Sequence, residues 1–84
     1  MIQKIDSEVS VKLTYNSKEK KVYPEEIIWN GRNYPFIKLG LHHTFKKGRS
    51  LYHVFSVISE TLFFKLILNT ETLHWRLEQI ADEY

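Results

Sequence analysis

The sequence of 84 residues predicts one all-β domain, 1–84, built as a curled antiparallel meander or small barrel of five to six strands. Apolar and polar residues alternate near the N-terminus, as they do in a half-buried strand. An Asn-Gly pair separates two apolar runs, and further apolar runs follow at short spacings. Helix-length periodicity is absent, so helix is expected at most as one short turn in the tail EQIADEY.

The first expected strand is 8–15, because its apolar residues recur at every second position: Val9, Val11, Leu13 and Tyr15. The charged segment 16–24 is expected to be a loop that ends at Pro24. Asn30-Gly31 then predicts a type I′ hairpin, because both residues tolerate positive φ. This turn pairs Trp29 with Arg32 and Ile27 with Tyr34. Pro35 cannot donate a ladder hydrogen bond, so a bulge or local edge is expected there.

The second half of the chain reads as three strands joined by tight turns. The expected strands are 50–58, 61–69 and 72–80, and the expected turns are Lys46-Lys47-Gly48, Ser59-Glu60 and Thr70-Glu71. For the hairpin around Lys47, pairing Leu41 with His53 keeps apolar residues together.

Strand alternation then divides the side chains between two faces of the sheet. The expected core face holds Ile28, Ile37, Leu39, Leu41, His43, Leu51, His53, Phe55, Val57, Leu62, Phe64, Leu66, Leu68, Leu73, Trp75 and Leu77. The opposite face mixes aromatic and basic residues: Trp29, Arg32, Tyr34, Phe36, Lys38, His42, Tyr52, Val54, Phe63, Lys65, Ile67, His74 and Arg76. Either this second face is a ligand platform, or the N-terminal strand, the tail or a dimer partner covers it, or the assumed register is wrong.

The composition excludes several kinds of chemistry. The sequence has no cysteine, which excludes disulfides, thiolate metal sites and cysteine nucleophiles. Three of the four histidines lie in HHTFKKGRSLYH (42–53), but the expected register directs His42 away from His43 and His53 and leaves His42 and His74 far apart. We therefore expect no metal site. No nucleophile frame or phosphate loop is present, so we expect no catalytic residue, no enzyme activity, no cofactor and no small-molecule substrate.

A nucleic-acid site is the sharpest functional prediction. Single-strand binders combine aromatic rings that stack on bases with cations that follow the backbone. The candidate residues are Trp29, Arg32, Tyr34, Phe36, Lys38, Lys46, Lys47, Arg49, Tyr52, Lys65 and Arg76. The formal charge of +2 permits such a partner without requiring it. The alternative is a module that uses the same aromatic face to bind another protein or a second copy of itself.

A family resemblance rests on three motifs, P-x-x-I-x-W-N-G-R-x-Y from Pro24, F-F-K-L from Phe63 and T-E-T-L-H-W-R-L from Thr70. The sequence resembles short bacterial domains of unknown function with an early W-x-G-R-x-Y hairpin and a late T-x-x-W-x-L strand. Some of these are found near translesion DNA polymerase genes. The resemblance implies a compact, mainly β domain and favours nucleic acid as partner, but it carries over no catalytic residue. The stretch 42–57 departs from the group, which has an acidic, Trp-rich loop there.

The N-terminal segment bears on the cellular compartment. MIQKIDSEVSV contains no long apolar stretch, so neither a signal peptide nor a membrane span is expected. A small domain without disulfides suits a reducing compartment. We therefore expect a cytoplasmic protein that does not associate with membranes.

Overall fold

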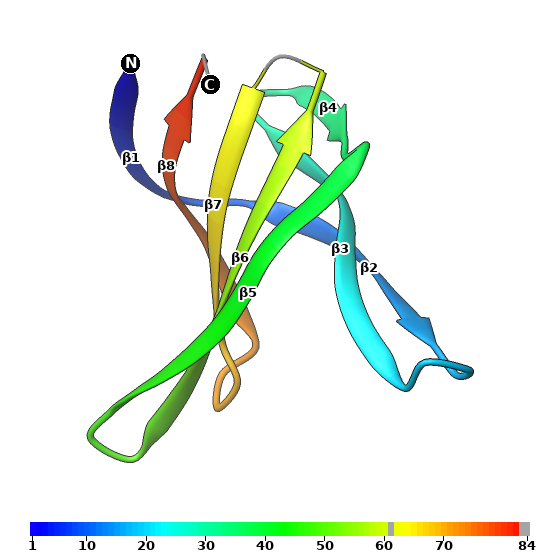
Figure 1. The fold of residues 1–84 in the computed structure, drawn as a ribbon. Helices are drawn as coiled ribbons and strands as arrows, with labels where there is room; N and C mark the ends of the chain where they lie inside the picture. The colour runs from blue at the N-terminus through cyan, green and yellow to red at the C-terminus, as the bar shows by residue number, and fades with distance from the viewer. Residues whose placement is uncertain (61, 83–84) are drawn as a thin grey trace.

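Two antiparallel sheets make up the computed structural model, which describes residues 1–60 and 62–82 (Figure 1). The strands are β1 (Ile2–Glu8), β2 (Ser10–Asn16), β3 (Lys21–Trp29), β4 (Arg32–Pro35), β5 (Lys38–Lys47), β6 (Ser50–Ser59), β7 (Leu62–Asn69) and β8 (His74–Ala81). The predicted all-β class is confirmed. No helix occurs in the described ranges, and none there could therefore cross a membrane.

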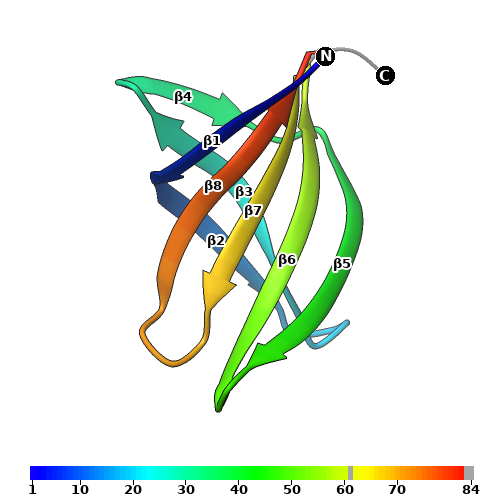
Figure 2. The ribbon, with the colours of Figure 1, turned by 90° about the vertical axis from the view of Figure 1, so that its left-hand side faces the viewer.

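The larger sheet has the order β1-β8-β7-β6-β5, and the smaller one has the order β2-β3-β4. The antiparallel meander is thus confirmed for β5 to β8, whereas the two sheets stay separate and do not close into a barrel. β1 lies along β8, and after a bend at Val9 the chain enters the smaller sheet as β2 (Figure 2). Only Phe36 and Ile37 connect β4 to β5, and the Ile37 amide donates to the Ile58 carbonyl across this corner.

The sequence predicts five to six strands, and the described residues form eight. β1 was missed because a register shift between Lys4 and Ser7, with Asp6 at a φ of 52°, breaks its alternation. The predicted helical turn in the tail is wrong for 78–81, which continue β8, while Glu83 and Tyr84 lie outside the described residues.

The Asn30-Gly31 hairpin is confirmed. Both residues have positive φ, 53° and 74°, as a type I′ turn requires. The predicted pairs are present, and Pro35 ends the short edge strand β4. The predicted loop 16–24 is too long, because β3 already begins at Lys21 and includes Pro24. This proline is tolerated beside a register shift in the β2–β3 ladder, where the hydrogen-bond pattern is interrupted.

The turns between β6, β7 and β8 differ in position or in length from the predicted two-residue loops. Ser59 pairs with Leu62, so the first turn lies one residue later than predicted, and Thr61 lies outside the described residues. The second turn spans four residues, because Asn69 pairs with His74. The backbone carbonyl of Asn69 accepts a hydrogen bond from the Leu73 amide at 2.6 Å, and the side-chain oxygen of Asn69 accepts one from the Glu71 amide at 2.9 Å. These local hydrogen bonds form a turn at residues where the sequence predicts continued pairing between the two strands.

The predicted register of the β5–β6 hairpin is wrong, and the error reverses the face of several side chains. His53 pairs with Thr44 instead of Leu41, and His42 pairs with Phe55. The turn itself is Gly48-Arg49, since Lys47 still pairs with Ser50. A register shift between Leu39 and His42 accommodates this change. His42 consequently lies on the side of Phe55, and His43 lies on the opposite side with Val54.

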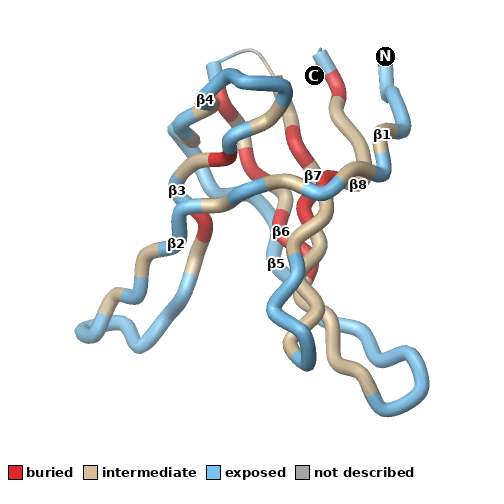
Figure 3. The backbone as a smooth tube through the Cα atoms, turned by 180° about the vertical axis from the view of Figure 1, so that it is seen from behind, coloured by how far each residue is buried: buried red, intermediate tan, exposed pale blue. Residues whose placement is uncertain are grey.

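The core lies where the two sheets meet, and Figure 3 shows the buried segments concentrated there. It consists of Ile27, Phe55, Val57, Phe64, Leu66 and Leu77. Other predicted core residues are exposed: Ile28, Ile37, Leu39, Leu41 and Leu73. Ile28 alternates with the buried Ile27, Ile37 is at the sheet connection, and Leu73 belongs to a turn. Leu39 forms the last pair before the register shift in β5, and Leu41 lies within that shift. Ile28 is thus exposed by strand alternation, whereas the other exceptions lie in a turn, at the sheet connection or at the register shift in β5.

Candidate functional site

The exposed end of the β5–β6 hairpin carries two aromatic and three basic side chains. Phe45 and Tyr52 are cross-strand partners, and their rings stack with centroids 4.9 Å apart and planes 5° apart. Beyond them lie Lys46, Lys47 and Arg49, all exposed. We call these five residues the basic tip. Phe45 was not among the candidates predicted from the sequence. The predicted register did not pair it with Tyr52, whereas the observed register does.

The predicted continuous aromatic face does not exist, because three of its rings point into the space between the sheets. Trp29, Tyr34 and Phe36 are partly buried and pack against the core. The ring centroids of Tyr34 and Phe64 are 5.3 Å apart, and those of Phe36 and Phe64 are 5.7 Å apart. The smaller sheet folds over the larger one and thereby turns these rings inward. As placed, they offer no open platform for bases.

Two other candidate cations lie away from the basic tip. The Arg32 guanidinium carbon is 6.0 Å from the centroid of the Tyr34 ring, which is within the range of a cation–π contact. Lys38 begins β5 and pairs with Ile58, at the end of the hairpin opposite the tip. The structure therefore brings together Lys46, Lys47, Arg49 and Tyr52 but separates them from Arg32 and Lys38.

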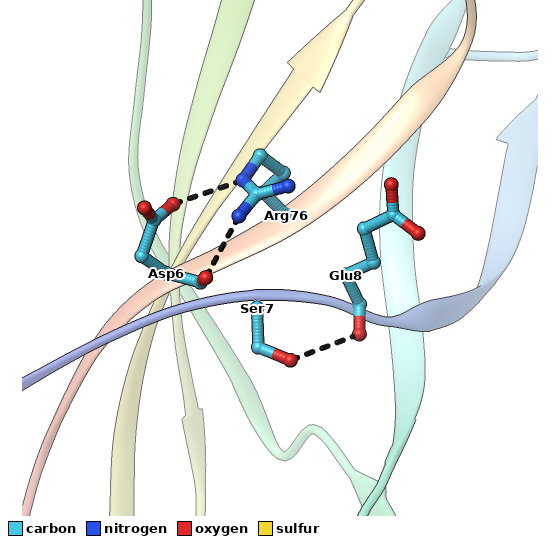
Figure 4. Close-up of polar contacts among 4 residues, drawn as sticks. All are labelled: Asp6, Ser7, Glu8 and Arg76. Atoms are coloured by element: carbon cyan, nitrogen blue, oxygen red, sulfur yellow. Dashed lines mark hydrogen bonds and ion pairs between the residues drawn. The ribbon is translucent and has the colours of Figure 1, made fainter.

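The remaining two candidates are engaged in ion pairs within the larger sheet. Nζ of Lys65 lies 3.0 Å from Oε1 of Glu78. Arg76 donates from Nε to the Asp6 carboxylate at 2.9 Å and from Nη2 to the Asp6 carbonyl at 2.7 Å (Figure 4). Next to this contact, the Ser7 hydroxyl donates to the Glu8 carbonyl at 3.3 Å. Arg76 thus links the irregular segment of β1 to β8, which is a structural role.

A second feature is a cleft of about 660 Å³ between the two sheets. The hairpins β2–β3 and β5–β6, which contribute to its lining, diverge from each other (Figure 1). Its lining comes from β3, β5, β6 and β7 and includes Val22, Tyr23, Leu39, Phe55 and Leu68. Lys20 and Lys21 line it at the start of β3, and His42 and His53 line it on the larger sheet. Ligand pockets commonly combine such apolar walls with a few polar groups in a volume of about 300–1,000 Å³.

The histidine pair is the most polar part of the cleft wall on the larger sheet. Nε2 of His42 lies 2.7 Å from Nδ1 of His53, and the His42 ring stacks on Phe55 at 4.2 Å between centroids. Burial lowers the pKa of His42 below its ordinary value of 6.5, and the charges of His53, His43 and Lys21 lower it further. His42 is therefore mainly neutral at pH 7, and in the contact between the two rings one ring donates a hydrogen bond to the other.

This pairing reverses the expectation for the histidines, because His42 and His53 lie side by side and His43 is directed away from them. In the described ranges no three His, Cys, Asp or Glu side chains are grouped so that they could hold a metal ion. Sequence reasoning missed the cleft altogether. The density of histidines in 42–53 was one signal for it. Gly40 was another, because it lies within the register shift between Leu39 and His42, and a glycine inside a strand often marks a bulge.

Comparisons with protein-family models, with curated proteins and with solved structures found no match for the chain.

Proposed function

We propose that the protein is a non-enzymatic binding module that binds single-stranded nucleic acid weakly through the basic tip. The observation that carries this proposal is the parallel Phe45–Tyr52 stack beside Lys46, Lys47 and Arg49. Stacked rings offer a flat apolar surface to a base, and neighbouring cations attract the phosphates on either side of it. This proposal keeps Lys46, Lys47, Arg49 and Tyr52 from the predicted site and adds Phe45.

The tip also explains why binding would be weak. Its cations lie on a two-stranded ribbon that projects from the sheet, so only a few phosphates can be contacted together. Glu71 lies close by, since its carboxylate accepts a hydrogen bond from the Ser50 hydroxyl at 2.8 Å. This negative charge opposes the attraction of phosphate. We therefore expect Glu71→Gln to strengthen binding.

The test is fluorescence anisotropy of a labelled single-stranded oligonucleotide at low salt and then at rising salt. The triple variant Lys46→Gln, Lys47→Gln, Arg49→Gln should lose most of the affinity. If the three cations each meet a phosphate, the slope of log K against log salt should fall by about 2. A matched control, Lys4→Gln, Lys12→Gln, Lys18→Gln, removes the same charge elsewhere and should change little. Equal losses in the two triple variants, or no anisotropy change with the unaltered protein, would contradict the proposal.

A second candidate function is self-association through the edge of β5. Among the described strands, β5 is the last strand of the larger sheet, and all ten of its residues are exposed, including Leu39 and Leu41. Free strand edges pair readily with other strands. Light scattering over a concentration series tests this candidate, and a monomer at the highest concentration would contradict it. Salt should weaken nucleic-acid binding strongly and β5 pairing little.

A further inference from the structure

The cleft between the sheets combines apolar walls with cations on one side only. Leu39, Phe55 and Leu68 contribute apolar surface from three adjacent strands of the larger sheet. Lys20 and Lys21 contribute two positive charges from the smaller sheet. Among the described residues that line the cleft, none is acidic. A ligand that matches both parts must have an apolar body and a negatively charged end.

The histidine pair adds directional hydrogen bonding. Because His42 and His53 share one proton between Nε2 and Nδ1, each ring keeps one other nitrogen. In a neutral pair, one of these two nitrogens carries a proton and the other has a lone pair, whichever ring is the donor. Whichever ring is the donor between them, the pair therefore presents one N–H group that can donate a hydrogen bond to an anion. In ligand pockets, such a donor commonly fixes the orientation of the polar end of the ligand.

We propose that this cleft binds a small amphipathic carboxylate, whose apolar body lies against Leu39, Phe55 and Leu68 and whose carboxylate meets Lys20 and Lys21. This site is distinct from the basic tip, which lies at the end of the β5–β6 hairpin, and it does not depend on nucleic-acid binding. The volume of about 660 Å³ suits a ligand of this size. The positive rim disfavours amines, since a like charge beside the lysines is repelled.

The first experiment titrates the protein with octanoate, octanol and octylammonium, all below the concentrations at which they form micelles. Backbone amide shifts are followed by two-dimensional NMR. We expect saturable shifts at Lys21, Gly40 and Phe55 with octanoate, weaker binding of octanol and the weakest binding of octylammonium. Absence of saturable shifts at these positions, or binding of octanol or octylammonium as tight as that of octanoate, would overturn the proposal.

The second experiment uses variants of exposed residues, so the fold is expected to persist. The double variant Lys20→Gln, Lys21→Gln should bind octanoate about fivefold more weakly, because it removes two exposed charge pairs of ordinary strength. Octanol binding should be unchanged. Leu39→Asn should weaken the binding of both octanoate and octanol, because it removes apolar surface from the wall of the cleft. If Lys20→Gln, Lys21→Gln binds octanoate as tightly as the unaltered protein does, the assignment of the carboxylate position is wrong.

The matched control is Lys46→Gln, Lys47→Gln, which removes the same charge at the basic tip. It should leave octanoate affinity unchanged while it lowers oligonucleotide affinity. An equal loss of octanoate affinity in this control would show a general charge effect and overturn the cleft proposal. The cleft and tip proposals can therefore fail separately, because each has its own ligand and its own pair of lysines.

Discussion

His42 Nε2 and His53 Nδ1 lie 2.7 Å apart on the neighbouring strands β5 and β6. The groups that act on His42 come from three strands: His43 on its own strand, His53 on β6 and Lys21 on β3. Burial and these three positive or protonatable groups lower its pKa, so the folded protein binds a proton at His42 less readily than the unfolded chain does. This difference makes stability depend on pH.

The first prediction concerns that dependence. Above the ordinary histidine pKa of 6.5, His42 is neutral in both states and its contribution to stability is complete. As the pH falls through 6.5, the unfolded chain takes up the proton first, so the free energy of unfolding decreases. Urea unfolding at pH 7.5 and at pH 5.5 measures the difference. His42→Gln should reduce this difference, and a variant that retains the full pH dependence would contradict the assignment.

The second prediction concerns Phe64, which joins the two sheets. It is fully buried, and its ring packs against Tyr34 from the smaller sheet and Phe36 from the connection that follows that sheet. Phe64→Ala should lower the free energy of unfolding by about 3–5 kcal/mol, because it removes the ring and leaves a cavity. Phe45→Ala is the control, since that ring is 40% exposed and should cost far less. Similar losses for the two variants in urea unfolding would contradict the inward packing of the smaller sheet.

The third prediction concerns backbone strain in the β7–β8 turn. Leu73 has a φ of 64°, and its side chain is largely exposed, so it gains little from burial. A side chain in this left-handed conformation costs about 1 kcal/mol, which glycine avoids. Leu73→Gly should therefore raise the free energy of unfolding by about that amount. Gly48→Ala is the reverse case, because Gly48 also has a φ of 64° and open space around it, and it should lower stability. A destabilised Leu73→Gly would show that the turn depends on the leucine side chain.

The fourth prediction concerns Arg76 and Asp6. The two bonds from Arg76 to the Asp6 carboxylate and carbonyl hold the irregular segment of β1 against β8. Both side chains are partly exposed, so Arg76→Met should cost only about 1 kcal/mol in global stability. Its clearer effect should be faster amide hydrogen exchange in β1. Arg49→Met is the control, and exchange in β1 that is unchanged by Arg76→Met would contradict the role given to this contact.

The candidate site was predictable only in part. Lys46, Lys47 and Arg49 could be placed at a hairpin end because turn residues and charge are local signals. The inward direction of Trp29, Tyr34 and Phe36 could not be read from 29–36, since alternation gives two faces without saying which one another sheet will cover. The cleft depended on the same long-range packing and on one register shift in β5.

By itself, the sequence determined the all-β class, the Asn30-Gly31 hairpin and the meander of the second half, because alternation and turn chemistry act between neighbouring residues. The tertiary structure alone decided that β1 and β2 belong to different sheets and that the smaller sheet covers Phe64. It also decided that His42 meets His53. These features depend on bulges and on contacts between distant segments, whose free energies are set by packing in three dimensions.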